Sequence, residues 1–295
     1  MICVTGNSVA APCGRRGLAR RGRHLRARLA ALALILIAPA GAAAQSLDDT
    51  FLRGSFRDSA SASRWDGFNF GVHAGLANMN TDFGNSTSSL VAFILRNSTL
   101  ENEAAPSNWT TLPSNTTNGR SYGVFLGYSF QWDQLVLGID LAYNRPSSLE
   151  GSASDSLERI VTTSDTVQHD VTIIAQSSIK LVDYATFRGR AGYAFGQFLP
   201  YAFIGGAVGR FNYSNAATVI DFQTVGGVLQ PPFVQSANNS KDGAIVGGLT
   251  TGLGVDVAIL PSLFMRAEWE FIAFAPVSGI RTNLNTGRVG IGLKF

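Results

Sequence analysis

Charged residues are scarce in this chain. They make up 15% of its 295 residues, against roughly 25% in soluble globular domains. This fraction excludes a highly charged disordered polymer and is unlike an enzyme with a charge-covered surface. The first 44 residues hold seven arginines and no acid, which leaves 16 basic and 20 acidic residues in the remainder. Without that segment the protein is mildly acidic, so nucleic acid is not an expected partner.

Cysteine and long apolar runs are also nearly absent. The two cysteines, Cys3 and Cys13, lie near the start of the chain, and no run of 18 apolar residues occurs. A membrane-spanning helix needs about 20 apolar residues, and many exported proteins rely on disulfides. The chain after residue 44 has neither feature, so another kind of structure must hold it together.

The N-terminal segment has the order of a secretory signal. Residues 15–28 are rich in arginine, residues 29–38 form a ten-residue apolar core, and small residues end at Ala44. This order predicts a signal peptide over residues 1–44, cleaved before Gln45. A transmembrane anchor is less favoured, because ten apolar residues cover about half of a bilayer. Residues 45–64 are polar and serine-rich, which predicts an irregular periplasmic lead-in.

From Trp65 onward the dominant pattern has period two, which places alternate residues on opposite faces of a β-strand. Glycine is abundant, with 32 residues. The alternation predicts eight strands, although it does not settle which face of the fifth one points inward. The predicted strands cover residues 68–76, 121–130, 135–144, 180–195, 199–213, 244–258, 263–271 and 287–295.

The connections between these strands alternate in length. Three are long (79–118, 145–178 and 214–242), three are short (131–134, 196–198 and 259–262), and the last (275–286) is intermediate. Long external loops and short periplasmic turns are typical of a transmembrane β-barrel. The long connections are rich in polar residues, except for an apolar patch at 90–95 that either extends a strand or covers one.

The two faces of the strands differ in a way that indicates lipid as the solvent. One face carries an apolar, aromatic-rich stripe, with Tyr122, Tyr143, Tyr193 and Trp269 as expected interface girdles. Eight strands enclose an interior that side chains fill, so the charges on the other face must pair. They form an expected lumen ion-pair network; a gated ion path lined by the same groups is the alternative. The residues are Asp140, Arg188, Arg190, Asp256, Arg266, Glu268, Glu270 and Arg288.

The sequence gives little support for catalysis. Glu268 and Glu270 share a strand face about 7 Å apart, a separation that glycosidase carboxylates can have, but neighbouring arginines favour ion pairing. His73 and His169 are scattered, with no nucleophile elbow and too few ligands for a metal. We therefore expect no catalytic, cofactor or metal site. The final Phe295 closes an alternating strand, as in the assembly signal of outer-membrane barrels.

Several segments resemble the small porin-like surface antigens of the alphaproteobacterial outer membrane, including proteins of the outer membrane immunogenic type. The matching segments are 65–75 (WDGFNFGVHAG), 187–193 (FRGRAGY), 199–206, 247–256, 266–270 (RAEWE) and 288–295 (RVGIGLKF). The first two long loops look longer than is common in that family. The resemblance implies an eight-stranded barrel that contributes to envelope integrity, with haemin binding in some members and no catalytic residues to transfer.

These observations predict an all-β protein, an eight-stranded antiparallel transmembrane β-barrel over residues 65–295, in the outer membrane of a Gram-negative bacterium. Expected partners are outer-membrane lipid and lipopolysaccharide, the barrel-assembly machinery through the C-terminal strand, and a small-molecule or host ligand at the loops. The rivals are a surface receptor or adhesin that binds haemin or a host ligand, and a barrel enzyme acting on lipid or peptides.

Overall fold

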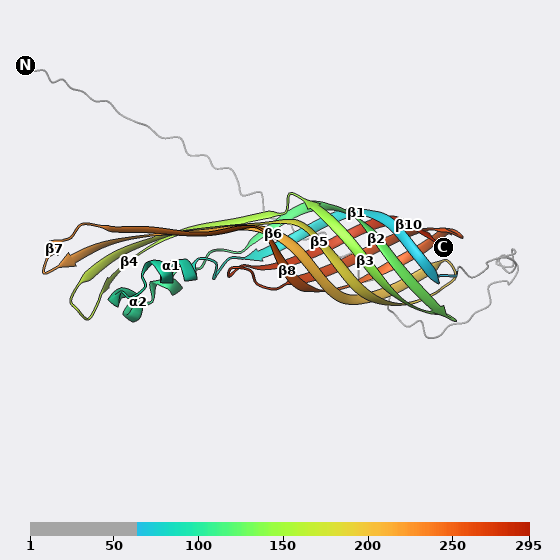
Figure 1. Cartoon of the computed structure of the whole chain (residues 1–295), viewed down its shortest axis with the longest axis horizontal. Coiled ribbons are helices and arrows are strands. Elements are labelled where there is room, and N and C mark those ends of the chain that lie inside the picture. Colours follow the sequence, from blue (N-terminus) through green and yellow to red (C-terminus); the bar gives the residue numbers. More distant parts are fainter. Residues whose placement is uncertain (1–63) are drawn as a thin grey trace, which may run out of the picture. The chain divides into compact units, whose positions relative to one another are not determined.

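A computed structural model describes residues 64–295, which belong to one compact unit, Arg57–Phe295 (Figure 1). The expected signal segment and all of the lead-in except Arg64 lie outside the described residues. The elements in chain order are β1 (Gly67–Asp82), α1 (Ser88–Ile94), α2 (Thr99–Ala104), the 3-10 helix η1 (Pro106–Asn108), β2 (Asn115–Trp132), β3 (Leu135–Ser147), β4 (Glu150–Thr162), β5 (Gln168–Tyr193), β6 (Phe198–Val225), β7 (Val228–Leu229), β8 (Phe233–Leu260), β9 (Leu263–Phe274) and β10 (Arg281–Lys294).

Eight of these strands form a closed ring in which all neighbours are antiparallel. The order is β1, β2, β3, β5, β6, β8, β9 and β10, and β10 then pairs with β1. The closing register runs from Asn69 opposite Lys294 to Asp82 opposite Arg281. The predicted all-β, eight-stranded antiparallel barrel is therefore confirmed, and closure leaves its strands without free edges.

The two faces of the barrel strands follow the predicted alternation. Leu137, Leu253 and Ile291 point outward and are 48%, 59% and 46% exposed, whereas Asp140 and Asp256 point inward and are buried. The facing of β6, which the sequence leaves open, is settled by its burial. Its odd-numbered residues from 199 to 211 point into the barrel and are buried, except that the glycine at 205 is only half-buried. Apolar side chains cover the outside and charges lie within.

The long connections predicted as loops at 145–178 and 214–242 are not loops over most of their length. Most of these residues are strand, and β5, β6 and β8 continue well beyond the ring, where β4 and β7 join them. We call this extension the arm: β4, β7 and residues 168–180, 213–225 and 233–241 of the longer strands (Figure 1). The arm adds two strands to the predicted eight without entering the ring.

Strand pairing changes where the arm leaves the barrel. Residues 184–193 of β5 pair with β3, ending at Tyr184 opposite Asn144. Residues 168–180, which come earlier in the chain, pair with β4 instead. Register shifts interrupt the β5–β6 pairing between Leu181 and Asp183 and the β6–β8 pairing beside Phe211. Such bulges bend a sheet locally, and here they mark the end of the barrel.

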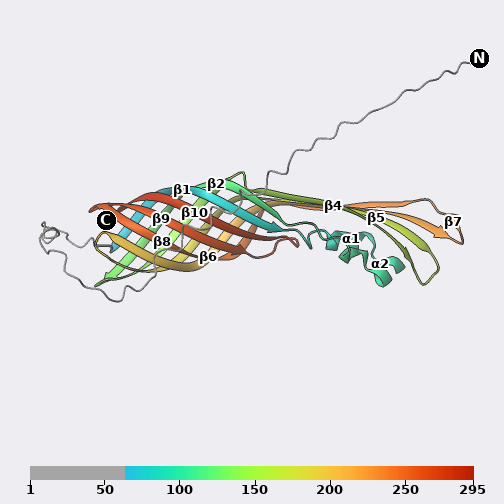
Figure 2. The same ribbon diagram turned by 180° about the vertical axis from the view of Figure 1, so that it is seen from behind.

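Two short helices cover one face of the arm (Figure 2). The apolar patch predicted at 90–95 lies in α1 and its C-cap, Leu95, and it covers the sheet rather than extending a strand. Val91 of α1 is fully buried against a cluster that includes Ile173 of β5 and Val219 of β6. Ser98 caps α2 by accepting a hydrogen bond from the backbone N–H of Glu101 at 3.1 Å, the first half of a capping box.

Apolar layers close the barrel interior on both sides of its charged residues. Near the short turns, buried residues such as Val136, Leu199 and Phe264 pack with Trp65. Towards the arm, Met79 and Leu284 are fully buried in a second cluster, which reaches into the connections through residues such as Phe83, Leu112 and Leu149. No helix among residues 64–295 is long and apolar enough to cross a bilayer.

Candidate functional site

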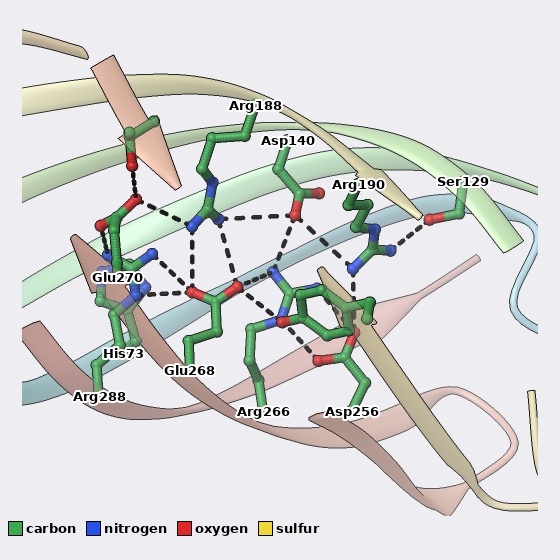
Figure 3. A network of polar contacts seen from close by, with 12 residues as sticks. His73, Ser129, Asp140, Arg188, Arg190, Asp256, Arg266, Glu268, Glu270 and Arg288 are labelled. Carbon is green, nitrogen blue, oxygen red and sulfur yellow. Dashed lines mark hydrogen bonds and ion pairs between the residues drawn. The ribbon is translucent and has the colours of Figure 1, made fainter. Parts of the chain in front are cut away.

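Between the two apolar layers lies a layer of charged side chains that come from five strands. The structure places all eight residues of the predicted lumen network here, and none is more than 6% exposed (Figure 3). The strand register explains the meeting, because it sets residues of neighbouring strands directly opposite each other. Asp140 of β3 faces Arg188 of β5, Asp256 of β8 faces Arg266 of β9, and Glu268 of β9 faces Arg288 of β10.

Two arginines hold the two glutamates on the arm side of this layer. Arg288 donates from Nε to Glu268 and from Nη1 to Glu270, each at 2.7 Å. Arg188, which is fully buried, contacts the same two carboxylates through Nη1 at 3.3 and 3.2 Å. Both glutamates therefore bridge two cations, which offsets the cost of burying four charges.

The aspartates bind the other two arginines nearer the short turns. Arg266 forms a bidentate contact with Asp256, in which Nε and Nη2 each donate at 2.8 Å. This geometry suits a planar guanidinium. Arg190 donates to the same aspartate at 3.1 Å. Asp140 joins the two halves, since its Oδ2 lies 3.4 Å from Arg266 and 3.6 Å from Arg188.

Aromatic rings, which the sequence analysis does not assign to the site, form walls around the arginines. The Arg266 guanidinium lies 4.2 Å from the ring centre of Phe125, and that of Arg188 lies 4.3 Å from that of Phe203. Tyr201 donates its hydroxyl to Glu268 at 2.7 Å. Cation–π contacts of this kind add to the stability of desolvated arginines. Sequence patterns could not assign Tyr201 and Phe203 to the site, because they do not settle which face of β6 points inward.

Several neutral groups complete the network. Thr250 donates to Glu270 at 2.9 Å, and Ser129 accepts a hydrogen bond from Arg190. His73 points inward as the alternation predicts, and its Nε2 lies 2.6 Å from Oδ1 of Asn144. Nothing in the spacing of these residues distinguishes them from other inward polar positions. Only the strand register shows that they lie next to the network.

Small residues make room for this layer. A Cβ at Gly254 would lie 2.5 Å from the ring of Tyr201, so only glycine lets that ring reach Glu268. This gives one physical reason for glycine in the barrel strands, where it otherwise weakens a strand.

The layer is electrically neutral, with four arginines facing four carboxylates. Glu268 and Glu270, the pair weighed as a general acid and base, are both engaged by arginines and buried, so this geometry presents neither to a substrate. Within the described part of the chain, no cluster of three or more histidine, cysteine or carboxylate side chains is arranged to hold a metal ion.

The outer surface of the barrel carries the expected aromatic residues. Tyr122, Tyr143, Tyr193 and Trp269 are all between 44% and 54% exposed. Phe295 donates its backbone N–H to Phe68 at 2.9 Å, and its ring stacks on that of Phe70, so the last residue lies at the seam between β10 and β1.

A closed antiparallel barrel with an apolar exterior and an ionic interior is the architecture of a β-barrel that spans a lipid bilayer. The family model of the outer membrane protein beta-barrel domain matches residues 30–295. The chain belongs to this family, and we conclude that it is a β-barrel protein of the Gram-negative outer membrane.

The chain is also similar to solved structures of bacterial proteins. Ail of Yersinia pestis, solved with the heparin analogue sucrose octasulfate, is 12% identical with a TM-score of 0.31, covering 78% of this chain and 99% of that one. Neisserial surface protein A is 16% identical with a TM-score of 0.30, covering 77% and 97%. OprG of Pseudomonas aeruginosa is 12% identical with a TM-score of 0.31, covering 78% and 97%. No curated protein matches the chain.

Proposed function

We propose that the protein is a non-enzymatic structural barrel of the outer membrane, with a sealed lumen, that contributes to envelope integrity and presents the arm at the cell surface. The observation that carries this proposal is the neutral, buried ionic layer between two apolar layers. An ion entering the lumen would have to break ion pairs in a desolvated layer. This costs several kcal/mol for each buried charge that loses its partner.

The gated ion path is the porin-like alternative, and conductance separates the two. The experiment is a planar-bilayer recording on purified, refolded protein. The sealed barrel should give no steady ohmic current, and Asp140→Asn should not create one, because the apolar layers remain in place on both sides. A reproducible open level in the wild-type protein would contradict the sealed barrel and favour a pore.

The remaining features of the proposal concern export and assembly. Residues 1–44 would be a cleaved signal peptide and 45–64 a periplasmic lead-in. Phe295, at the seam of the barrel, would be read by the barrel-assembly machinery, and lipopolysaccharide would surround the outward apolar face. The resemblance to porin-like surface antigens of alphaproteobacteria supports the envelope role.

A second candidate is a surface receptor or adhesin that binds haemin or a host ligand. The arm is the observation in its favour, because a long sheet beyond the ring offers more surface than short loops. Its test is adhesion or haemin binding by cells that display the wild-type protein, compared with cells displaying a variant whose arm is replaced by short turns.

A further inference from the structure

A pocket of about 320 Å³ opens in the arm, away from the barrel and its ionic layer. One wall is the segment from the end of α1 to the start of α2, and the other is formed by β5, β6, the first residue of β8 and the turn before β5. This volume is at the lower end of the range of small-molecule sites, roughly 300–1,000 Å³.

A buried histidine–aspartate pair lies in the sheet wall of this pocket. His169 Nδ1 lies 2.8 Å from Oδ2 of Asp221, and both residues are buried. Gln223 donates to the same Oδ2 at 2.9 Å. When Nδ1 carries the proton of the neutral imidazole, the Nε2 atom of His169 is left as a hydrogen-bond acceptor.

The pair leaves an acceptor without a donor. Oδ1 of Asp221 is buried and receives no hydrogen bond from any residue between 64 and 295, and a buried unsatisfied carboxylate oxygen is costly. The hydrogen bond of the His169 ring to Asp221 runs through Nδ1, so Nε2 is the ring nitrogen that a ligand could engage. The exposed Asp165 adds a second carboxylate to the pocket.

The helical wall, residues 94–100, carries both polar and apolar side chains. Leu100 of this wall is buried, and Phe233 of the sheet wall is 37% exposed. Apart from His169, the lining has one basic residue, Arg96, whose guanidinium lies over the ring of Phe93 at 4.2 Å. The pocket therefore combines carboxylate and imidazole groups of the sheet side with apolar side chains from both walls.

We infer that this pocket is a binding site for a small primary amine with an apolar body. A protonated amine supplies three N–H donors and one positive charge, which match the free Oδ1 of Asp221, Nε2 of His169 and the carboxylate of Asp165. Charge-assisted hydrogen bonds of this type are among the strong ones. The apolar part of the ligand would pack between Leu100 and Phe233.

The test uses the full protein refolded in micelles and the probe 2-phenylethylamine, with 2-phenylethanol and 3-phenylpropionate as neutral and anionic matches. Binding is followed by calorimetry and by the side-chain ¹⁵N NMR signal of His169, which reports on this pocket rather than on partition into detergent. We expect saturable binding of the amine alone, with a shift of the His169 signal.

Matched variants locate the site. Asp221→Asn should weaken amine binding by about 10- to 100-fold, because it removes a charged acceptor. Asp165→Asn, at an exposed position, should weaken it less, and Asp155→Asn, an exposed carboxylate of β4 outside the pocket, should leave it unchanged. If Asp221→Asn does not fold, as judged by heat-modifiable gel mobility, the comparison of Asp165→Asn with Asp155→Asn decides.

Three results would overturn the inference. They are the absence of saturable amine binding up to about 10 mM, equal binding of the alcohol or the anion, and equal amine affinity in Asp165→Asn, Asp221→Asn and the wild-type protein.

Discussion

Glu268 is the most connected carboxylate of the ionic layer, and its replacement by glutamine tests the whole network. It accepts hydrogen bonds from Nε of Arg288 at 2.7 Å, from Arg188 at 3.3 Å and from the hydroxyl of Tyr201 at 2.7 Å. Glu268→Gln keeps the shape of the side chain but removes its charge. The lumen is then left with four arginines and three carboxylates.

Removing one partner of a buried ion pair typically costs 3–5 kcal/mol, because an uncompensated charge stays buried. Glu268 has two close cationic partners, so we expect Glu268→Gln to lower the free energy of unfolding by about 3–5 kcal/mol. The measurement is urea unfolding of the protein refolded in lipid vesicles, followed by heat-modifiable gel mobility and by tryptophan fluorescence. Glu158→Gln, on the exposed arm strand β4, should change it by less than about 0.5 kcal/mol.

A double variant distinguishes charge imbalance from a simple packing defect. Combining Glu268→Gln with Arg288→Met restores equal numbers of arginines and carboxylates. Its total loss should be smaller than the sum of the two single losses by about 1–3 kcal/mol. A loss below about 1 kcal/mol for Glu268→Gln, or strict additivity in the double variant, would show that the layer is not an energetically coupled network.

Two further predictions concern close packing and pH. Gly254→Ala would place a Cβ 2.5 Å from the ring of Tyr201, so we expect a loss of about 1–3 kcal/mol in the same unfolding assay, whereas Gly206→Ala, with nothing within 4 Å, should cost nothing. The pKa of Asp165 is lowered by hydrogen bonds from the Thr163 hydroxyl and then from a backbone N–H, so its stabilisation of the turn at 163–167 is present above the ordinary carboxyl pKa of about 4 and is lost as the pH falls through the lowered value. The protection of amides in this turn, measured as exchange relative to the intrinsic rate at each pH, should therefore fall on acidification in the wild-type protein and show no such step in Asp165→Asn; an identical fall in the variant would contradict this assignment.

The barrel could be predicted from the sequence because lipid imposes a strict rule on every strand. Each outward residue between the rims must be apolar, so the alternation stays clear in segments such as 135–144, and charges stand out against it. The ionic residues were predictable for the same reason. Their partners Tyr201 and Phe203 were not, because β6 is apolar on both faces. Its burial, with Phe203 opposite Gly252 and Tyr201 opposite Gly254 of β8, shows which side points inward.

The arm escaped prediction at two identifiable points. In the barrel part of β5, even-numbered residues such as Arg188 face inward, whereas above the bulge odd-numbered residues such as Ile173 are the buried ones. One extra residue reverses the facing of everything beyond it. The same occurs on β8 beside Gly243, which has a φ of +69°. The predicted strands began at 180 and 244, next to these bulges, because the alternation changes phase there.

The phase change also explains how one strand serves two environments. Below the bulge, the outward face of β5 meets lipid and carries Phe187, while Arg188 lies in the ionic layer. In the arm the outer face has no lipid to meet. The apolar residues Val171 and Ile173 there face α1 and α2 instead. The bulge places these apolar residues on the helix-covered face of the arm. Without the extra residue they would lie on the opposite, outer face. The arm is thus built like a soluble two-layer sheet and the barrel like its inverse, and the change of register joins the two.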